Sequence, residues 1–350
     1  MAEVITSPSN PKIKRLLALQ QKSSARREAG LFVVEGQREL QHCIDAGFEI
    51  DSVFVCTSLG GGAPRQNFAS LIPPTASQRV PPVHEATGGH GFAGETPALA
   101  SSQTLSFPGD AETAAASGNR SHPRLRKREG PGDEVVGRGP AQQDVSGGWL
   151  PRSKAGNDIK VFEVSEEVYA RIAMRESTEG VIAEVRTKER RLENLDLPER
   201  PLVVVLESVE KPGNLGAVLR SADAAGVDAV LFCDPLTDLW NPNLIRASLG
   251  AVFTVPCVAC SSAEAIAFLK ARGIRILTAQ LQDSSLYYDC DMTAGTALVM
   301  GTESTGLTPA WREAADAHIR IPMLGRLDSL NVSVSAAILL FEAVRQRRNG

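Results

Sequence analysis

The C-terminal stretch Ile321-Pro-Met-Leu-Gly-Arg-Leu-Asp-Ser-Leu-Asn-Val-Ser-Val-Ser-Ala336 is the part of the sequence from which the fold can be worked outward. A strand at 317–321 ends at a proline, and a glycine-containing loop then leads into a polar cluster that opens a long apolar helix at 330–345. Ser329 and Asn331 are residue types that cap helix N-termini, so backbone N–H groups should point out of the helix end there. Alone, the pattern predicts only a strand, a loop and a capped helix that close an α/β domain.

Upstream of that stretch, apolar segments of strand length alternate regularly with helical patterns. The capping box Ser261-x-x-Glu264, for example, begins a helix that Gly273 ends. Continuous apolar strands that alternate with helices are typical of a parallel sheet covered on both faces. We therefore predict an α/β domain with a parallel sheet for residues 201–350. Its other expected elements are strands at 202–206, 230–233, 253–255, 274–278 and 297–300 and helices at 215–225 and 242–250.

The N-terminal part of the chain is interrupted by a segment of different composition. Residues 58–158 are rich in Gly, Pro, Ser, Ala and Thr and show no sustained helical or strand periodicity. Such a segment cannot bury enough apolar surface to offset its chain entropy, and structureless loops this long are rare inside compact domains. We expect a disordered insertion within one small α/β domain at 1–187, followed by a linker at 188–200. The expected elements of that domain are helices at 11–20, 38–46 and 165–174 and strands at 31–35, 50–55, 159–164 and 180–185.

The bulk composition argues against several function classes. A net charge of −4 and a pI near 5.9 do not suit a general polyanion binder. Basic residues do cluster at 12–27 and 345–348, where they would either contact phosphate or form solvated helix faces. Six scattered cysteines form no disulfide framework, and Cys257-Val-Ala-Cys260 lacks the second ligand pair of a zinc site. No segment resembles a signal peptide or a membrane span, so we expect a cytoplasmic protein without a metal or a membrane partner.

Three loops follow predicted strands of the parallel sheet, at the ends where open α/β sheets bind ligands. The first, at 207–216, leads into a helix with Asn214 at its start and Arg220 nearly two turns further on. An arginine can bind a phosphate through two parallel hydrogen bonds, whereas a lysine offers only a point charge. A Pro-Gly turn with a capping asparagine and a surface arginine would give the same pattern.

The second loop, Gly301-Thr-Glu-Ser-Thr-Gly306, directly follows an apolar strand and places the carboxylate of Glu303 at the strand end. Leu307 and Thr308 stand where a P-loop has lysine and serine or threonine, so ATP binding is not supported. The first strand of the domain is not followed by the Gly-x-Gly-x-x-Gly of a dinucleotide site either. The third loop is the opening stretch. Each loop alone could be an ordinary turn, but three at the strand ends of one sheet indicate a binding site.

Together the three loops resemble the motifs of a known enzyme family. The segments 214–220, Gly301-x-Glu303-x-x-Gly306 and 321–333 are similar, in order and spacing, to those of the SpoU/TrmH family of RNA ribose 2′-O-methyltransferases, in the SPOUT class. The N-terminal part resembles the L30e-like substrate-binding domain of that family in Phe32-Val-Val-Glu-Gly36 and Gly180-Val-Ile-Ala183. Residues 58–158 match no part of the family pattern.

This resemblance implies a deep trefoil knot in the C-terminal domain, which bottom-up reasoning would not suggest because true knots are very rare. It also implies an obligate homodimer that completes the site, and S-adenosylmethionine bound in a bent form by the backbone of the knot loops. The implied cofactor-binding residues are Leu277, Thr278, Gly301, Gly306, Ile321, Met323 and Leu330.

The implied chemistry is in-line transfer of a methyl group from a sulfonium to a ribose 2′-OH. The family arginine, here Arg220, is often described as the general base. Because arginine keeps its proton in proteins, we expect Arg220 to bind the neighbouring phosphate and favour deprotonation electrostatically, and the identity of the base stays open. The polar frame around Arg220 and the ribose would consist of Asn214, Glu303, Ser329 and Asn331.

The RNA substrate is expected to be ribosomal RNA more than transfer RNA, because a separate L30e-like domain suits a folded target read by shape and 2′-OH groups. Alternatives are a knotted RNA-binding protein without catalysis, a SPOUT enzyme that methylates a base, and a nucleotide-binding α/β protein. The expected RNA-binding residues of the N-terminal domain are Lys12, Lys14, Arg15, Arg26, Glu35 and Arg38.

Overall fold

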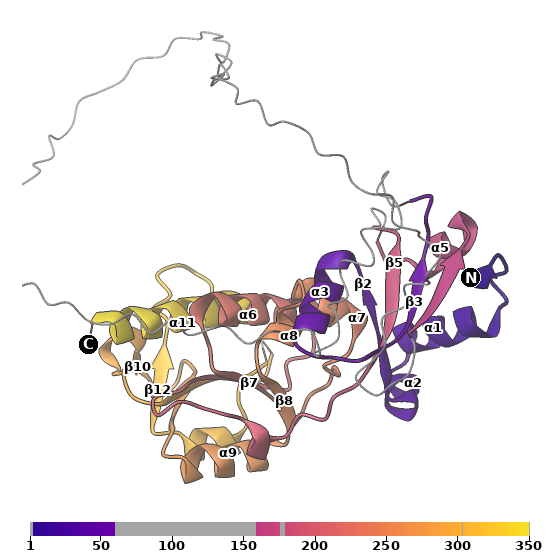
Figure 1. Cartoon of the computed structure of the whole chain (residues 1–350). Helices are drawn as coiled ribbons and strands as arrows, with labels where there is room; N and C mark the ends of the chain where they lie inside the picture. Colours follow the sequence, from indigo (N-terminus) through magenta and orange to yellow (C-terminus); the bar gives the residue numbers. More distant parts are fainter. Residues whose placement is uncertain (1–2, 60–158, 176–178, 303, 350) are drawn as a thin grey trace, which may run out of the picture. The chain divides into compact units, whose positions relative to one another are not determined.

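The structure is a computed structural model of the 350-residue chain, and it describes residues 3–59, 159–175, 179–302 and 304–349 (Figure 1). The insertion predicted at 58–158 lies outside the described residues from residue 60 onward, and Glu303 lies outside them as well. The described residues all belong to one compact unit, which has an N-terminal and a C-terminal lobe.

The N-terminal lobe has a mixed sheet with the strand order β1-β4-β3-β5-β2. The middle strand β3 pairs in parallel with β4 and antiparallel with β5, so the segments before residue 60 and after residue 158 contribute neighbouring strands to one sheet. Asn10 caps the first helix by accepting a hydrogen bond from the backbone N–H of Lys12 at 2.9 Å. The elements are β1 (Glu3–Ile5), α1 (Pro11–Gln21), α2 (Ser23–Ala29), β2 (Leu31–Glu35), α3 (Gln37–Asp45), β3 (Ile50–Val55), β4 (Lys160–Val164), α5 (Glu166–Ile172) and β5 (Val181–Arg186).

The C-terminal lobe has a seven-stranded sheet in the order β10-β12-β9-β11-β6-β7-β8, and all of its strand pairs are parallel. The predicted parallel-sheet α/β architecture is confirmed. The trefoil knot stays a prediction. The strands are β6 (Leu202–Glu207), β7 (Ala229–Cys233), β8 (Cys257–Cys260), β9 (Arg275–Ala279), β10 (Ser285–Leu286), β11 (Thr296–Met300) and β12 (Ala317–Arg320).

Helices cover both faces of this sheet (Figure 1). Along β6, Val204 and Leu206 belong to the hydrophobic cluster shared with α6 and α11, whereas Val203 and Val205 belong to the cluster shared with α9 and α10. Strands buried on both faces explain why they are apolar without alternation. The remaining elements are η2 (Leu192–Asn194), α6 (Pro212–Ala225), α7 (Pro242–Ala247), α8 (Ala251–Thr254), α9 (Ser262–Ala271), η3 (Tyr287–Asp289), α10 (Pro309–Ala314) and α11 (Val332–Asn349).

One predicted strand is wrong. The segment Phe253-Thr-Val255 was expected to be extended, but residues 251–254 form the short helix α8, and the strand begins after Pro256, over Cys257-Val-Ala-Cys260. Val255, the residue before the proline, is extended and ends the helix, as residues before proline usually are. The short elements β1, α2, β10 and α10 were not predicted, because each has too few residues to show a periodic pattern.

The predicted linker at 188–200 packs against both lobes. Arg190 donates a hydrogen bond to the carbonyl of Val252 at 3.0 Å and lies over the rings of Phe48 and Trp240. Trp240 in turn stacks on Phe32 of the N-terminal sheet, with 4.7 Å between ring centroids. These aromatic contacts place side chains of both lobes in one hydrophobic cluster.

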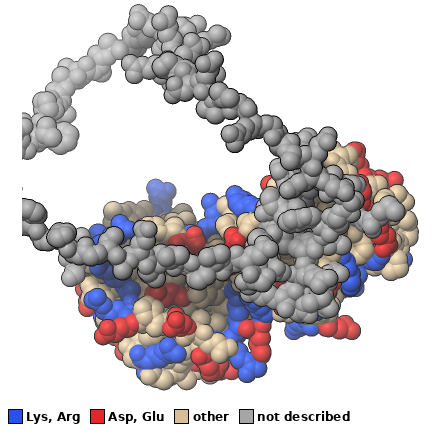
Figure 2. Space-filling model, in the orientation of Figure 1, with Lys and Arg blue, Asp and Glu red and all other residues tan. Residues whose placement is uncertain are grey.

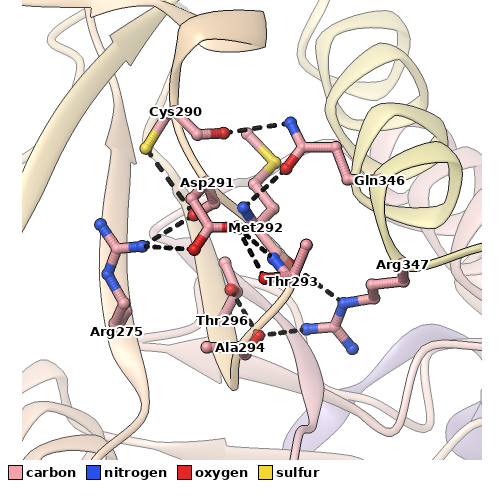
Figure 3. A network of polar contacts seen from close by, with 9 residues as sticks. All are labelled: Arg275, Cys290, Asp291, Met292, Thr293, Ala294, Thr296, Gln346 and Arg347. Atoms are coloured by element: carbon pink, nitrogen blue, oxygen red, sulfur yellow. Dashed lines mark hydrogen bonds and ion pairs between the residues drawn. The ribbon is translucent and has the colours of Figure 1, made fainter. Parts of the chain in front are cut away.

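The C-terminal end of α11 is held by a polar network (Figure 3). The guanidinium of Arg347 donates hydrogen bonds to the carbonyls of Met292 and Ala294, at 3.0 and 2.7 Å, and to those of Arg200 and Pro201, both at 2.9 Å. The side chain of Gln346 accepts from the backbone N–H of Met292 at 2.8 Å. Burial lowers the pKa of Arg347 from its ordinary value.

Candidate active site

The first and third predicted loops meet at the N-terminal end of α11, which lies beside α6 (Figure 1). The side-chain nitrogen of Asn331 donates a hydrogen bond to the side-chain oxygen of Asn214 at 3.1 Å, across 117 residues of sequence. Asn331 also caps α11, because its Oδ1 accepts from the backbone N–H of Ser333 at 2.9 Å. One asparagine therefore fixes both the helix start and the Asn214 amide.

Arg220 lies on the exposed side of α6. It follows Asn214 by six residues, which is about 9 Å along an α-helix. In the described part of the chain, no hydrogen bond or ion pair holds its guanidinium. The charge of Arg220 is therefore available to an anionic ligand on the exposed side of α6. Ser329, which is exposed, donates a hydrogen bond from its hydroxyl to Asp328 at 3.2 Å.

The second predicted loop is compact and depends on its two glycines. A Cβ at Gly301 would lie 2.3 Å from the carbonyl oxygen of Gly306, so a larger residue at position 301 would force the loop apart. Gly306 has a φ of +67°, which glycine adopts readily and other residues rarely do. The backbone N–H of Gly306 donates to the carbonyl of Thr302 at 3.1 Å. Glu303, between them, lies outside the described residues.

The other predicted cofactor residues lie at the same edge of the sheet, because β9, β11 and β12 are neighbours. Leu277 and Thr278 are fully buried, and the Thr278 hydroxyl lies 2.6 Å from Nδ1 of His318. Since the Leu277 side chain belongs to the core, only its backbone could face a ligand. Ile321 and Met323 are half-buried beyond the end of β12, and Leu330 is 36% exposed.

Comparisons with known proteins agree with this arrangement. The model of the SpoU rRNA Methylase family matches residues 201–341, and that of the MRM3-like substrate binding domain matches residues 10–80. The 23S rRNA (guanosine-2′-O-)-methyltransferase RlmB of Escherichia coli is 40% identical over 176 residues, which are 48% of this chain and 72% of RlmB. The chain belongs to the SpoU family.

Solved structures of SpoU-type enzymes have the same fold. The crystal structure of an RNA 2′-O ribose methyltransferase is 30% identical, with a TM-score of 0.66 over 99% of both chains. The AdoMet-bound rRNA methyltransferase of Sinorhizobium meliloti is 23% identical, with a TM-score of 0.68 over 98% of both chains.

Two polar residues of this SpoU chain were missed by the sequence reasoning. Gln280 follows β9, and its backbone N–H donates to the carbonyl of Ile319 at 3.0 Å. The side-chain nitrogen of Gln280 donates to the carbonyl of Gln282, but its Oε1 is buried and has no hydrogen-bond partner in the described structure. Glu207, the second residue, is a buried carboxylate at the end of β6. For Glu207, a polar residue that ends an otherwise apolar strand was the available signal; Gln280 directly follows a strand that also contains Arg275 and Thr278, so it had no comparable signal.

The cysteines of β7 and β8 are structural thiols. Cys233 and Cys260 lie on neighbouring strands with their Sγ atoms 4.0 Å apart, and this contact and burial raise the pKa of Cys233. Burial raises the pKa of Cys257 to about 12. Neutral thiols are poor metal ligands. Among the residues that the structure describes, no group of three His, Cys, Asp or Glu residues could hold a metal ion.

The predicted RNA-binding residues of the N-terminal lobe fall into two groups. Lys14 is exposed, and Arg38 is largely exposed although it forms an ion pair with Glu39 at 3.3 Å. Lys12 pairs with Glu3, and Arg15 pairs with Glu184, but both keep more than a third of their side chains exposed. On the face shown in Figure 2, basic and acidic side chains are mixed.

Arg26 and Glu35 are placed differently from surface RNA contacts. Arg26 is 3% exposed, its guanidinium forms an ion pair with Asp238, and it donates to the carbonyl of Leu19 at 2.6 Å. The carboxylate of Glu35 accepts from the backbone N–H of Met174 at 2.9 Å, and burial raises the pKa of Glu35. The buried position of Arg26 does not fit the prediction that it contacts RNA at the surface. A buried arginine needs an anionic partner, and the ion pair of Arg26 with Asp238 joins the two lobes in the interior.

Proposed function

We propose that this protein is an S-adenosylmethionine-dependent RNA methyltransferase that methylates a ribose 2′-OH of structured RNA, with ribosomal RNA as the favoured substrate. The observation that carries the proposal is the Asn331–Asn214 hydrogen bond, which brings the first and third SpoU motifs together at α6, the helix that also carries the exposed Arg220. The 2′-O-methylation of 23S rRNA by the relative RlmB supports the same reaction and substrate class.

The residues at the sheet edge suit S-adenosylmethionine. The unpaired Oε1 of Gln280 would be an acceptor for the exocyclic amine of adenine, and the close packing of Gly301 on Gly306 keeps the neighbouring loop compact. When bound, S-adenosylmethionine supplies an already activated methyl group. Leu277, Thr278, Ile321, Met323 and Leu330 would complete the cradle.

The protein's own part of the reaction is positioning and charge. Arg220 would bind the phosphate next to the target ribose and stabilise the developing 2′-oxyanion, while Asn214 and Asn331, with Ser329 and Glu303, would orient the ribose. The described site offers no metal cluster for this role. In the N-terminal lobe, Lys12, Lys14, Arg15 and Arg38 would contact the RNA backbone.

A second copy of the chain is the proposed partner of the C-terminal lobe. Leu324 and Leu327, in the third motif, are 97% and 75% exposed, and Val334 and Phe341 of α11 are about half exposed. Apolar side chains gathered beside a site mark an interaction surface. The described helices include none that could span a membrane, and we propose the cytoplasm as the location.

The test is methylation of total ribosomal RNA by the full chain with methyl-labelled S-adenosylmethionine, followed by digestion to nucleosides. A labelled 2′-O-methylnucleoside supports the proposal. Label on a base would identify a base methyltransferase, and RNA binding without cofactor binding would identify an inactive RNA-binding protein. Light scattering of wild type and of Leu327→Ser tests the dimer: a wild-type monomer would contradict it.

A further inference from the structure

A buried carboxylate outside the predicted site joins two elements of the C-terminal lobe. Glu207, the last residue of β6, is 2% exposed. Its Oε2 accepts a hydrogen bond from the backbone N–H of Thr308 at 2.9 Å, and its Oε1 accepts one from the Thr308 hydroxyl at 2.7 Å. Thr308 precedes α10 but does not cap it with its side chain, so its donor groups serve Glu207 instead.

These bonds close the loop that contains Gly301 and Gly306. At the start of the loop, Met300 of β11 lies opposite Leu206 in the parallel ladder. At its end, Thr308 is bonded to the next residue of β6, Glu207. The loop therefore begins and ends beside the last two residues of one strand. Because residue 301 has no room for a side chain against residue 306, a movement of Thr308 would be transmitted directly to the glycines.

The helix after the loop has a second anchor. Trp311 of α10 is fully buried, and its Nε1 donates to the hydroxyl oxygen of Ser262 at 2.9 Å. The Ser262 hydroxyl donates in turn to Asp234 at 2.6 Å and makes a longer contact of 3.3 Å with Oε1 of Glu207. Since the shorter bond of Ser262 to Asp234 does not depend on Glu207, loss of the Glu207 carboxylate should loosen the loop more than the helix.

We propose that Glu207 is a positioning residue that holds the 301–307 loop in the shape that binds S-adenosylmethionine; this rests on the proposed function. An apolar residue would fill the end of β6 with less desolvation cost than a buried carboxylate. The specific contribution of Glu207 is therefore its hydrogen bonding, mainly the two short bonds from Thr308 at 2.9 and 2.7 Å, which no apolar side chain can replace.

The experiment measures the Kd for S-adenosylmethionine by calorimetry and the steady-state constants of RNA methylation, on the full chain. Glu207→Leu and Thr308→Val should each weaken cofactor binding, the former by about tenfold, as expected for hydrogen bonds to a charged group. We expect the cofactor KM to rise in parallel, kcat at saturating cofactor to stay within about twofold, and the double variant to be less than additive. Hydrogen exchange at Gly306 and Thr308 should become faster in the cofactor-free protein.

The matched control is Glu184→Leu, which removes another fully buried carboxylate, bonded to Ser52 in the N-terminal sheet. It should lower Tm without changing the cofactor Kd. Unchanged cofactor affinity in both Glu207→Leu and Thr308→Val would overturn the inference, and if Glu207→Leu fails to fold, Thr308→Val alone decides. A wild-type protein that does not bind S-adenosylmethionine would overturn the proposed function, and the inference with it.

Discussion

The two ends of α11 use polar residues in opposite ways. At the N-terminal end, Asn331 bonds Asn214 of α6, the helix that also carries the exposed Arg220, and Leu324 and Leu327 of the preceding loop are open to solvent. At the C-terminal end, Arg347 donates to four backbone carbonyls, of which Figure 3 shows those of Met292 and Ala294, so few of its N–H groups remain for a ligand. The contrast teaches that an arginine in a basic cluster can be a structural clamp, while an isolated one on a helix face can belong to the site.

The largest effect is expected from Arg220→Ala. Loss of its charge next to the phosphate should reduce methylation about 10²- to 10³-fold, as for removal of one electrostatic catalytic group, with Tm and cofactor Kd unchanged. Methylation assays, thermal unfolding and calorimetry give the three readouts. A loss of cofactor affinity would show that the N-terminal end of α11 also depends on Arg220 structurally, and the contrast between the two ends would weaken.

Arg347→Met should do the reverse. It keeps the apolar stem but removes all four donated bonds and leaves the carbonyl of the buried Met292 without this donor, so we expect the free energy of unfolding to fall by about 2 kcal/mol, with normal activity per folded molecule. Chemical denaturation measures the change. The control is Arg348→Met on the exposed neighbour, which should be close to neutral. Equal stability of the two variants would refute the clamp.

Asn331→Asp separates the two functions of one residue. Aspartate still accepts from the Ser333 N–H and suits a helix N-terminus, so Tm should be kept. It cannot donate to Asn214, and we expect methylation to fall about tenfold. An Asn331→Ala variant, which lacks the cap as well, should lose about 1 kcal/mol of stability in addition. Full activity of Asn331→Asp would remove the Asn214 contact from the mechanism.

The smallest effect is expected at Gln280. Gln280→Leu should weaken S-adenosylhomocysteine binding about fivefold, as for one neutral hydrogen bond, and should not further weaken binding of the analogue that carries a 6-oxo group instead of the amine. Calorimetry with both ligands checks this. Equal losses for the two ligands would mean that Gln280 shapes the loop and does not contact adenine.

Much of the fold was predictable because its signals are local. Several elements can be recognised from only a few consecutive residues, and the structure contains all of them. They are the apolar strands 202–206 and 297–300, the capping box at Ser261 and the Asn331 cap. The strand predicted at 253–255 failed, because β-branched and aromatic residues also suit a buried helical turn.

The site was only partly predictable, for a related reason. Asn214 and Asn331 were each predicted to lie at a helix start. The hydrogen bond between them could not be predicted, because it joins residues far apart in the sequence. The bonds of Glu207 to Thr308 and of Arg347 to Met292 also join residues far apart in the sequence, so no local sequence pattern predicts them. Arg26 was read as a surface cation, since its neighbours are polar, although its partner Asp238 comes from the other lobe.

The clamp at Arg347 has a consequence for modularity. It ties the point where the chain enters the C-terminal lobe, Arg200 and Pro201, to the last turn of the helix where the chain leaves it. A unit whose two connections emerge side by side can be transplanted into a loop of another protein, or circularly permuted, without stretching its sheet. The coding segment for the C-terminal lobe could therefore be moved between genes as one unit.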